Sequence, residues 1–184
     1  MKIFRVTPIE GSQFFLTNLP NGSEFVRTHI NGEKRTDGWV PLPIRIVEKT
    51  NQGRPRRPVD SCLLEMLSSA IAIKRDVVPR LESLLLPHGE LLAAVGEGVE
   101  AVVFNVTKVV DALNEEKSEV FRSSQGRILE ISKYYLRRSD LADIEIFKVP
   151  NLRVCPVLFS EKAVRSWERQ KITGLGFDHV GYAT

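Results

Sequence analysis

Residues 154–180 constrain the fold most strongly, because they contain a complete pattern of strand, helix and strand. Residues 157–159 form a short run of β-branched and aromatic side chains, which is typical of a buried strand. Ser160 follows as a helix N-cap, and Glu161 lies in the first turn, where the helix dipole favours negative charge. This segment therefore predicts a strand that leads directly into a helix.

The predicted helix has one apolar side. The apolar residues that recur at helical spacing are Ala163, Val164 and Trp167. Gly174 and Gly176 end the pattern, and residues 177–180 predict a second strand. All of this is scaffold, and none of these residues indicates a reaction.

The same plan occurs earlier in the chain. Residues 71–73 correspond to residues 157–159, and residues 91–95 correspond to residues 177–180. Between them we expect a helix with Asp76 as its N-cap and with apolar positions at Val77, Val78, Leu81, Leu84 and Leu85. A solenoid needs at least three units, so two units predict a duplicated architecture instead.

Short apolar runs between turn residues predict further strands in the N-terminal part. Residues 3–6 and 14–16 should form a hairpin, and residues 42–47 should form an edge strand, because prolines flank Leu42. An Asn-Gly pair predicts a second tight hairpin at residues 29–33.

The C-terminal part has its own strand signals. Residues 91–95 and 99–106 should form a hairpin around a Gly-Glu-Gly turn, and residues 108–113 should form a short helical turn. Three further strands are expected, at residues 120–122, 128–136 and 144–147.

Residues 51–58 form the clearest break in the chain. Their prolines prevent a helix and their charges prevent burial, so we expect an exposed connector. It divides a β-rich portion, residues 1–59, from a more α/β-like portion, residues 60–184, although both could belong to one continuous domain. The expected fold class is α+β, with mixed, mainly antiparallel sheets and two strand-helix-strand units.

The composition is that of an ordinary globular protein, with 42% hydrophobic and 27% charged residues. Its longest apolar runs, such as residues 101–104, are far shorter than the ~20 residues that span a bilayer. The first residues contain no long apolar stretch or cleavage site, so the sequence predicts a cytoplasmic protein without a membrane partner.

The net charge of +3 is mild for a nucleic-acid-binding protein, which usually gathers basic residues on one face. The one compact basic group consists of Arg54, Arg56 and Arg57. Arginines between prolines are typical of a solvated linker, so the sequence favours a protein without a nucleic-acid partner.

Residues with catalytic or metal-binding potential are scattered. Cys62 and Cys155 have apolar neighbours, which predicts buried free thiols rather than a disulfide or a nucleophile. Acid pairs such as Asp140 with Asp143 are typical of a solvated surface. The histidines, which lack the spacing of metal ligands, are His29, His88 and His179. We therefore expect neither a cofactor nor catalysis.

Several stretches, taken in order, resemble a known family. Residues 104–113 read Phe-Asn-Val-Thr-Lys-Val-Val-Asp-Ala-Leu, residues 158–161 read Leu-Phe-Ser-Glu, and residues 174–177 read Gly-Leu-Gly-Phe. Their order and spacing are similar to those in the eleventh-numbered immunity-protein family of bacterial polymorphic toxin systems. That family was first catalogued as a domain of unknown function. The resemblance covers residues 71–180, but Lys74 stands where the second unit has Ser160.

The resemblance implies a non-catalytic protein of interbacterial competition, which binds and silences a toxin encoded by an adjacent gene. We expect exposed loops to contact this toxin, with Trp39 as an anchor beside Arg54, Arg56 and Arg57. Inhibitors of nucleases often present an acidic face, and a chain at +3 does not favour one. A local acidic patch would change this expectation, and its residues would be Glu115, Glu116 and Glu119.

Two alternatives stay open. An enzyme that uses scattered acids and arginines would have a deep pocket lined by acids with shifted pKa values. A nucleic-acid-associated regulatory module built on the arginines of residues 54–57 would bind in a salt-dependent way. Self-association is compatible with each of these functions.

Overall fold

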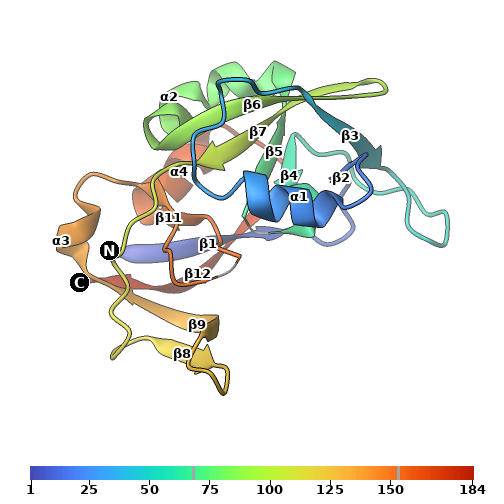
Figure 1. Ribbon diagram of the computed structural model, residues 1–184. Coiled ribbons are helices and arrows are strands. Elements are labelled where there is room, and N and C mark those ends of the chain that lie inside the picture. Colours follow the sequence, from blue (N-terminus) through green and yellow to red (C-terminus); the bar gives the residue numbers. More distant parts are fainter. Residues whose placement is uncertain (68, 153) are drawn as a thin grey trace.

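The computed structural model describes residues 1–67, 69–152 and 154–184. Within these residues the chain forms two mixed, mostly antiparallel sheets of six strands with short helices around them, which confirms the α+β fold class (Figure 1). The first sheet contains, in spatial order, β10 (Ile146–Phe147), β11 (Leu158–Ser160), β1 (Lys2–Pro8), β12 (Leu175–Ala183), β9 (Ile128–Leu136) and β8 (Glu119–Arg122).

The second sheet contains, in spatial order, β4 (Ser61–Leu63), β5 (Ile71–Lys74), β7 (Val99–Val106), β6 (Gly89–Gly96), β3 (Leu42–Val47) and β2 (Phe14–Thr17). The α-helices are α1 (Gly22–His29), α2 (Glu82–Leu85), α3 (Arg138–Leu141) and α4 (Glu161–Arg169). Short 3-10 turns are η1 (Leu64–Met66), η2 (Arg75–Arg80) and η3 (Leu86–His88).

The two sheets repeat one plan. From β10 to β8 the neighbouring strands are antiparallel except for the parallel pair β12 and β9. From β4 to β2 the directions follow the same order, with β6 and β3 as the parallel pair. The duplicated plan is therefore confirmed, and it extends beyond the two strand-helix-strand units. Strand β1 takes the place in the first sheet that β7 takes in the second.

The C-terminal unit forms as the sequence predicts. The Ser160 Oγ accepts a hydrogen bond from the Ala163 N–H at 3.1 Å and caps α4. The apolar side of α4 is buried, and Trp167 is only 1% exposed. In the earlier unit Asp76 is not the cap, because the turn begins after Lys74, whose side chain makes no capping bond. Pro79 lies inside η2, where its missing N–H interrupts a regular helix.

Three local predictions for the N-terminal part are wrong. Strand β2 pairs with β3 and not with β1, because β1 lies between β11 and β12. Residues 29–33 form no hairpin, since α1 occupies the preceding residues and buries Val26 and Ile30 against the second sheet. Strand β3 is not an edge strand, because it lies between β2 and β6.

Residues 108–113 form no helical turn. They are extended, and isolated bridges join Val109 to Lys148 and Leu113 to Leu136. Most backbone hydrogen bonds of this segment are tertiary, for example from the Val110 N–H to the Lys148 carbonyl oxygen at 2.8 Å.

The central core joins both halves of the chain. One apolar cluster draws side chains from both sheets and from the α2 and α4 regions, for example Val6, Ile73, Leu81, Phe104 and Trp167. The connector at residues 51–58 is largely exposed, as expected. Strands from residues 1–59 lie in both sheets beside strands from residues 60–184.

Candidate functional site

The sequence-predicted contact residues do not form one surface. Trp39 precedes β3, its ring is half-buried, and its Nε1–H donates to the Ala93 carbonyl oxygen at 2.9 Å. The connector with the three arginines follows the other end of β3. At the rise of a β-strand, the two ends of β3 are roughly 17 Å apart. The proposed aromatic anchor is therefore separated from the basic group.

Two of the three arginines are engaged within the chain. The Arg56 guanidinium lies 5.0 Å from the centroid of the Phe14 ring, and its Nη1 donates to the Ser12 carbonyl oxygen at 3.3 Å. The Arg57 Nη2 donates to the Glu10 carbonyl oxygen at 2.6 Å. Arg54 is exposed, so it is the member of this group that offers its charge most freely to solvent.

The expected acidic patch is partly neutralised. Glu115 forms an ion pair with Arg122, and the Glu119 carboxylate lies 3.8 Å from the Lys133 Nζ. Only Glu116 of the three acids has no ion pair with a described residue. This region is therefore a mixed charged surface rather than an acidic face.

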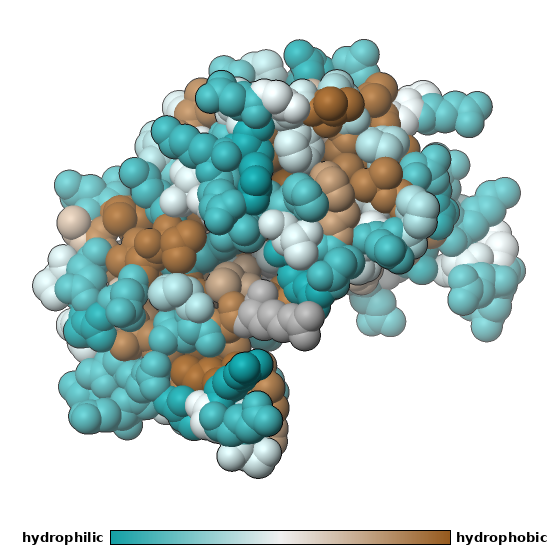
Figure 2. All heavy atoms as spheres, viewed as in Figure 1, coloured by the Kyte–Doolittle hydropathy of each residue, from teal (hydrophilic) through white to brown (hydrophobic). Residues whose placement is uncertain are grey.

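An apolar surface lies on the β8–β9 hairpin, which projects at the lower end of the molecule (Figure 1). Phe121 is 65% exposed and Leu129 is 58% exposed. Phe121 pairs with Glu130 and shares its face of the hairpin, and Leu129 is the neighbour of Glu130 in β9, where the pairing has an irregularity. Figure 2 shows apolar atoms exposed among polar ones on this lower part.

A hollow of about 290 Å³ adjoins Leu129 but is not lined by Phe121. Its apolar walls come from β9 and from the segment that precedes β11, and include Leu129, Ile131, Tyr134, Leu152 and Pro156. We call Phe121, Leu129 and this hollow the hairpin surface. Strand β8, at its rim, is the last strand of the first sheet as described.

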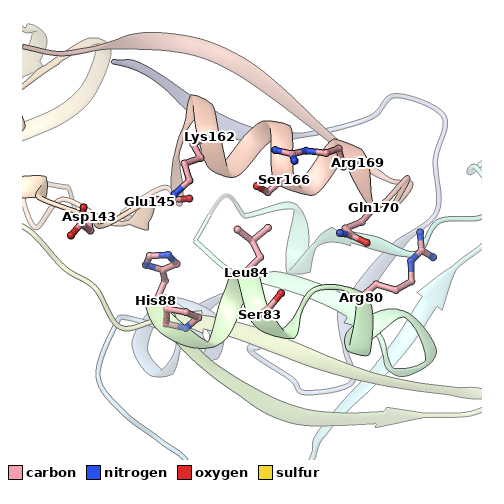
Figure 3. Close-up of a pocket in the computed structure, with 11 residues that line it drawn as sticks. Arg80, Ser83, Leu84, His88, Asp143, Glu145, Lys162, Ser166, Arg169 and Gln170 are labelled. Carbon is pink, nitrogen blue, oxygen red and sulfur yellow. Dashed lines mark hydrogen bonds and ion pairs between the residues drawn. The ribbon is translucent and has the colours of Figure 1, made fainter.

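A polar groove of about 440 Å³ lies between the α2 region and α4 (Figure 3). Arg80, Arg169 and Gln170 form one end, and Ser83, Leu84 and Ser166 lie in the middle. The other end contains His88, Asp143, Glu145 and Lys162. We call this the α2–α4 groove.

His88 forms the buried wall of this groove. It is 8% exposed, and its Nδ1 has no hydrogen-bond partner among the described residues. Burial lowers the pKa of His88, and the nearby Glu145 carboxylate opposes this change only in part. Glu145 pairs with Lys162, and this hydrogen bond raises the pKa of the Lys162 ammonium. Sequence spacing missed this set because its members come from three separate segments.

Lys148 is a second feature that the sequence did not reveal. Its side chain is 0% exposed, and its Nζ donates to the Ile30 carbonyl oxygen, at the C-terminal end of α1, at 2.9 Å. Burial lowers the pKa of Lys148 from 10.5 to about 8. The lysine therefore ties α1 to the segment that follows β10.

Between pH 8 and pH 9 the wild type should gain about 1 kcal/mol of stability relative to the Lys148→Met variant. The folded pKa of Lys148 lies below its ordinary value, so in this range the folded protein loses a proton that the unfolded chain keeps, and stability rises with pH. Urea unfolding of both proteins at each pH measures the effect. Burial raises the pKa values of Cys62 and Tyr134 to about 12, so these residues make the stability fall as the pH rises. Their contributions are the same in both proteins and cancel in the comparison. A constant difference between the two proteins would contradict the assignment.

The remaining candidates stand apart from one another. Both cysteines are free, Cys62 buried and Cys155 half-buried. His29 stacks on Phe25, and His179 lies between Phe4 and Tyr182. Within the described ranges, no group of three or more His, Cys, Asp or Glu side chains is placed to hold a metal ion.

Two comparisons with known proteins found no relative for this chain. A scan against models of protein families found no match, and a search of curated proteins found no similar sequence. In the part of the chain that the structure describes, none of the helices has the length and apolar character needed to cross a bilayer.

Proposed function

We propose that this chain is a non-catalytic immunity protein, which binds and neutralises a secreted bacterial toxin encoded by an adjacent gene. The proposal combines the sequence resemblance with one structural observation, the exposed hairpin surface. On this proposal the protein acts in the cytoplasm of the bacterium that makes the toxin, and it neutralises the toxin by occupying part of the toxin's surface.

The hairpin surface has the composition of an interface centre. Phe121 and Leu129 leave more than half of their surface in water, and burying such side chains stabilises a complex by about 1.5–3 kcal/mol each. Aromatic anchors that fill hollows on a partner supply much of the binding energy of protein interfaces. The surface therefore supports a protein partner better than a small polar substrate.

The charges around the hairpin surface support the same class of partner. The ion pairs of Glu115 with Arg122 and of Glu119 with Lys133 place both signs of charge at its rim. A polar, balanced rim around an apolar centre is typical of protein interfaces. Because this rim is not acidic overall, it does not favour the strongly basic active site of a nuclease as the target.

The edge of the first sheet offers a further mode of contact. The outer side of β8 can accept a strand from a partner, because β8 ends the sheet as described. Main-chain hydrogen bonds would then add affinity, and Phe121 would provide the side-chain anchor.

The Phe121→Asp variant should bind the product of the adjacent gene at least about 100-fold more weakly than the wild type does, as expected for a hot-spot aromatic. Isothermal titration calorimetry with the purified toxin domain measures the affinity, and growth of cells that express the toxin reports neutralisation. Val40→Asp is the matched control, because Val40 is 77% exposed but lies before β3, far from the hairpin in sequence.

Two outcomes would contradict this proposal in different ways. If the wild-type pair does not associate at about micromolar concentration, the immunity function is wrong. If Phe121→Asp binds normally while Arg54→Glu or Trp39→Ala abolishes binding, the partner docks on the loops predicted from sequence and not on the hairpin surface.

A further inference from the structure

We propose that an apolar pocket at the junction of the two sheets binds a small amphipathic anion, an unbranched aliphatic carboxylate whose charged end lies at Arg56 and whose chain fills the pocket. This site shares no residue with the hairpin surface, and its occupancy does not depend on the proposed function. Its volume of about 280 Å³ is close to the lower end of the range of roughly 300–1,000 Å³ that is typical of small-molecule sites.

The pocket has mainly apolar walls. The loop of residues 9–13, which joins β1 of the first sheet to β2 of the second, contributes one wall, and the rest comes from β4, η1 and Gly174. We call it the β1–β2 pocket, and its apolar lining residues are Pro8, Ile9, Phe14, Cys62, Leu63 and Met66. The Cys62 Sγ accepts a hydrogen bond from the Phe15 N–H at 3.2 Å, and burial raises the pKa of the thiol to about 12. The thiol therefore stays neutral and acts as an apolar wall.

The loop of residues 9–13 is held in place by the connector. The Gln13 N–H donates to the Arg57 carbonyl oxygen at 2.8 Å, and the Arg57 N–H donates to the Gly11 carbonyl oxygen at 2.9 Å. Gly11 lines the pocket, and a Cβ added there would meet no atom within 4 Å. The space beside the loop is therefore open, and the backbone hydrogen bonds prevent the loop from closing it.

Arg56 supplies a positive charge to the pocket. Its guanidinium lies 5.0 Å from the centroid of the Phe14 ring, and its Nη1 donates to the Ser12 carbonyl oxygen at 3.3 Å; all three residues line the pocket. The Nε is closed to solvent, so the Nη2, which has no hydrogen bond with a described residue, is the donor left for a ligand. Glu10 also lines the pocket, but its exposed side chain forms no ion pair with Arg56. A half-buried guanidinium without a counter-charge favours an anion.

Two apolar side chains of the pocket remain in contact with water. Met66 is 48% exposed and Ile9 is 38% exposed. Met66 has a left-handed backbone with a φ of +57°, and the preceding Glu65 has a φ of +55°. Such residues persist only where the surrounding structure fixes them, and here the Glu65 carboxylate accepts a hydrogen bond from the Thr17 Oγ1 at 2.8 Å. The fold thus holds a flexible apolar side chain at the pocket, where a ligand chain would cover it.

These features favour a ligand with both an apolar chain and a negative end. Each methylene group that leaves water for the apolar walls should tighten binding about fourfold. A carboxylate can pair with Arg56 through charge-assisted hydrogen bonds, whereas an alcohol of the same length would leave this charge without a counter-ion. A short carboxylate would pair with Arg56 but would leave Ile9 and Met66 in water.

Isothermal titration calorimetry of the purified full chain with octanoate, butanoate and octan-1-ol tests this site. We expect octanoate to bind at least about 10-fold more tightly than either of the other probes. Arg56→Gln should weaken the binding of octanoate at least about 10-fold and leave that of octan-1-ol unchanged. Met66→Asn should weaken the binding of both about 5-fold without loss of stability, because asparagine adopts left-handed backbone more readily than methionine does.

Arg54→Gln is the matched control, because Arg54 is exposed in the same connector and does not line the pocket. It should bind all three probes as the wild type does, and circular dichroism should show the same folded signal for every variant. The proposal is wrong if octanoate does not bind at about 10 mM, or if octan-1-ol binds as tightly as octanoate does. Equal weakening by Arg54→Gln and Arg56→Gln would also overturn it, as would loss of octanoate binding in Phe121→Asp.

Discussion

Replacing Trp167 by alanine should lower the free energy of unfolding by about 3–5 kcal/mol. Its ring is 1% exposed and packs edge-on against the rings of Phe159 and Phe177, with centroids 6.1 Å away in both cases. Alanine would leave a large cavity in the cluster that joins both sheets, and a close-packed core refills such a space only in part. Urea unfolding followed by circular dichroism measures the change.

Trp39→Ala is the control for this prediction, because the same residue type is only half-buried there. It removes one hydrogen bond to Ala93 and part of a contact with Phe25, so we expect a loss of about 1–2 kcal/mol. Equal losses for the two tryptophans would show that burial in the central cluster is not the source of the stability of α4.

Gly174→Ala should destabilise the protein by at least about 3 kcal/mol and should reduce the soluble yield. Gly174 has a φ of +106°, which alanine rarely adopts, and an added Cβ would overlap the carbonyl oxygen of Ser61. The backbone cannot move away cheaply, because the Thr173 carbonyl oxygen accepts a hydrogen bond from the Ser61 N–H at 3.0 Å. Thermal and urea unfolding of the variant measure the loss.

Gly11→Ala separates conformational strain from steric overlap. Gly11 also has a positive φ, of +73°, but an added Cβ would meet no atom within 4 Å. We therefore expect a loss of only about 1 kcal/mol there. If Gly174→Ala were no more harmful than Gly11→Ala, the close approach of the two chain segments at Ser61 would have no energetic importance.

These two predictions concern the contacts on which both proposals depend. Trp167 belongs to the central cluster, which also contains Leu63 of the β1–β2 pocket. Gly174 lines that pocket and allows β12 to start beside β4, and β12 carries the parallel pairing with β9 that positions the hairpin surface. A loss at either position should therefore weaken ligand or partner binding indirectly, so the binding variants need separate folding controls.

The sequence by itself determined the features that depend on neighbouring residues. The Ser160 cap and the buried side of α4 follow from local spacing, and the structure contains both. The helix ends earlier than the glycines predicted, at Arg169, and Lys171 has the positive φ that follows its end. The repeated strand-helix-strand plan was also readable, because the same apolar pattern occurs at corresponding positions of the two units.

Only the tertiary structure decided which distant segments meet. Strand β2 pairs with β3 because β1 is taken up between β11 and β12, and no local pattern encodes that choice. Residues 22–29 became helix α1, which buries Val26 and the C-cap residue Ile30, and the burial of Lys148 depends on the Ile30 carbonyl at the end of that helix. The α2–α4 groove arises in the same way, because folding brings together charged and polar side chains that are far apart in the chain.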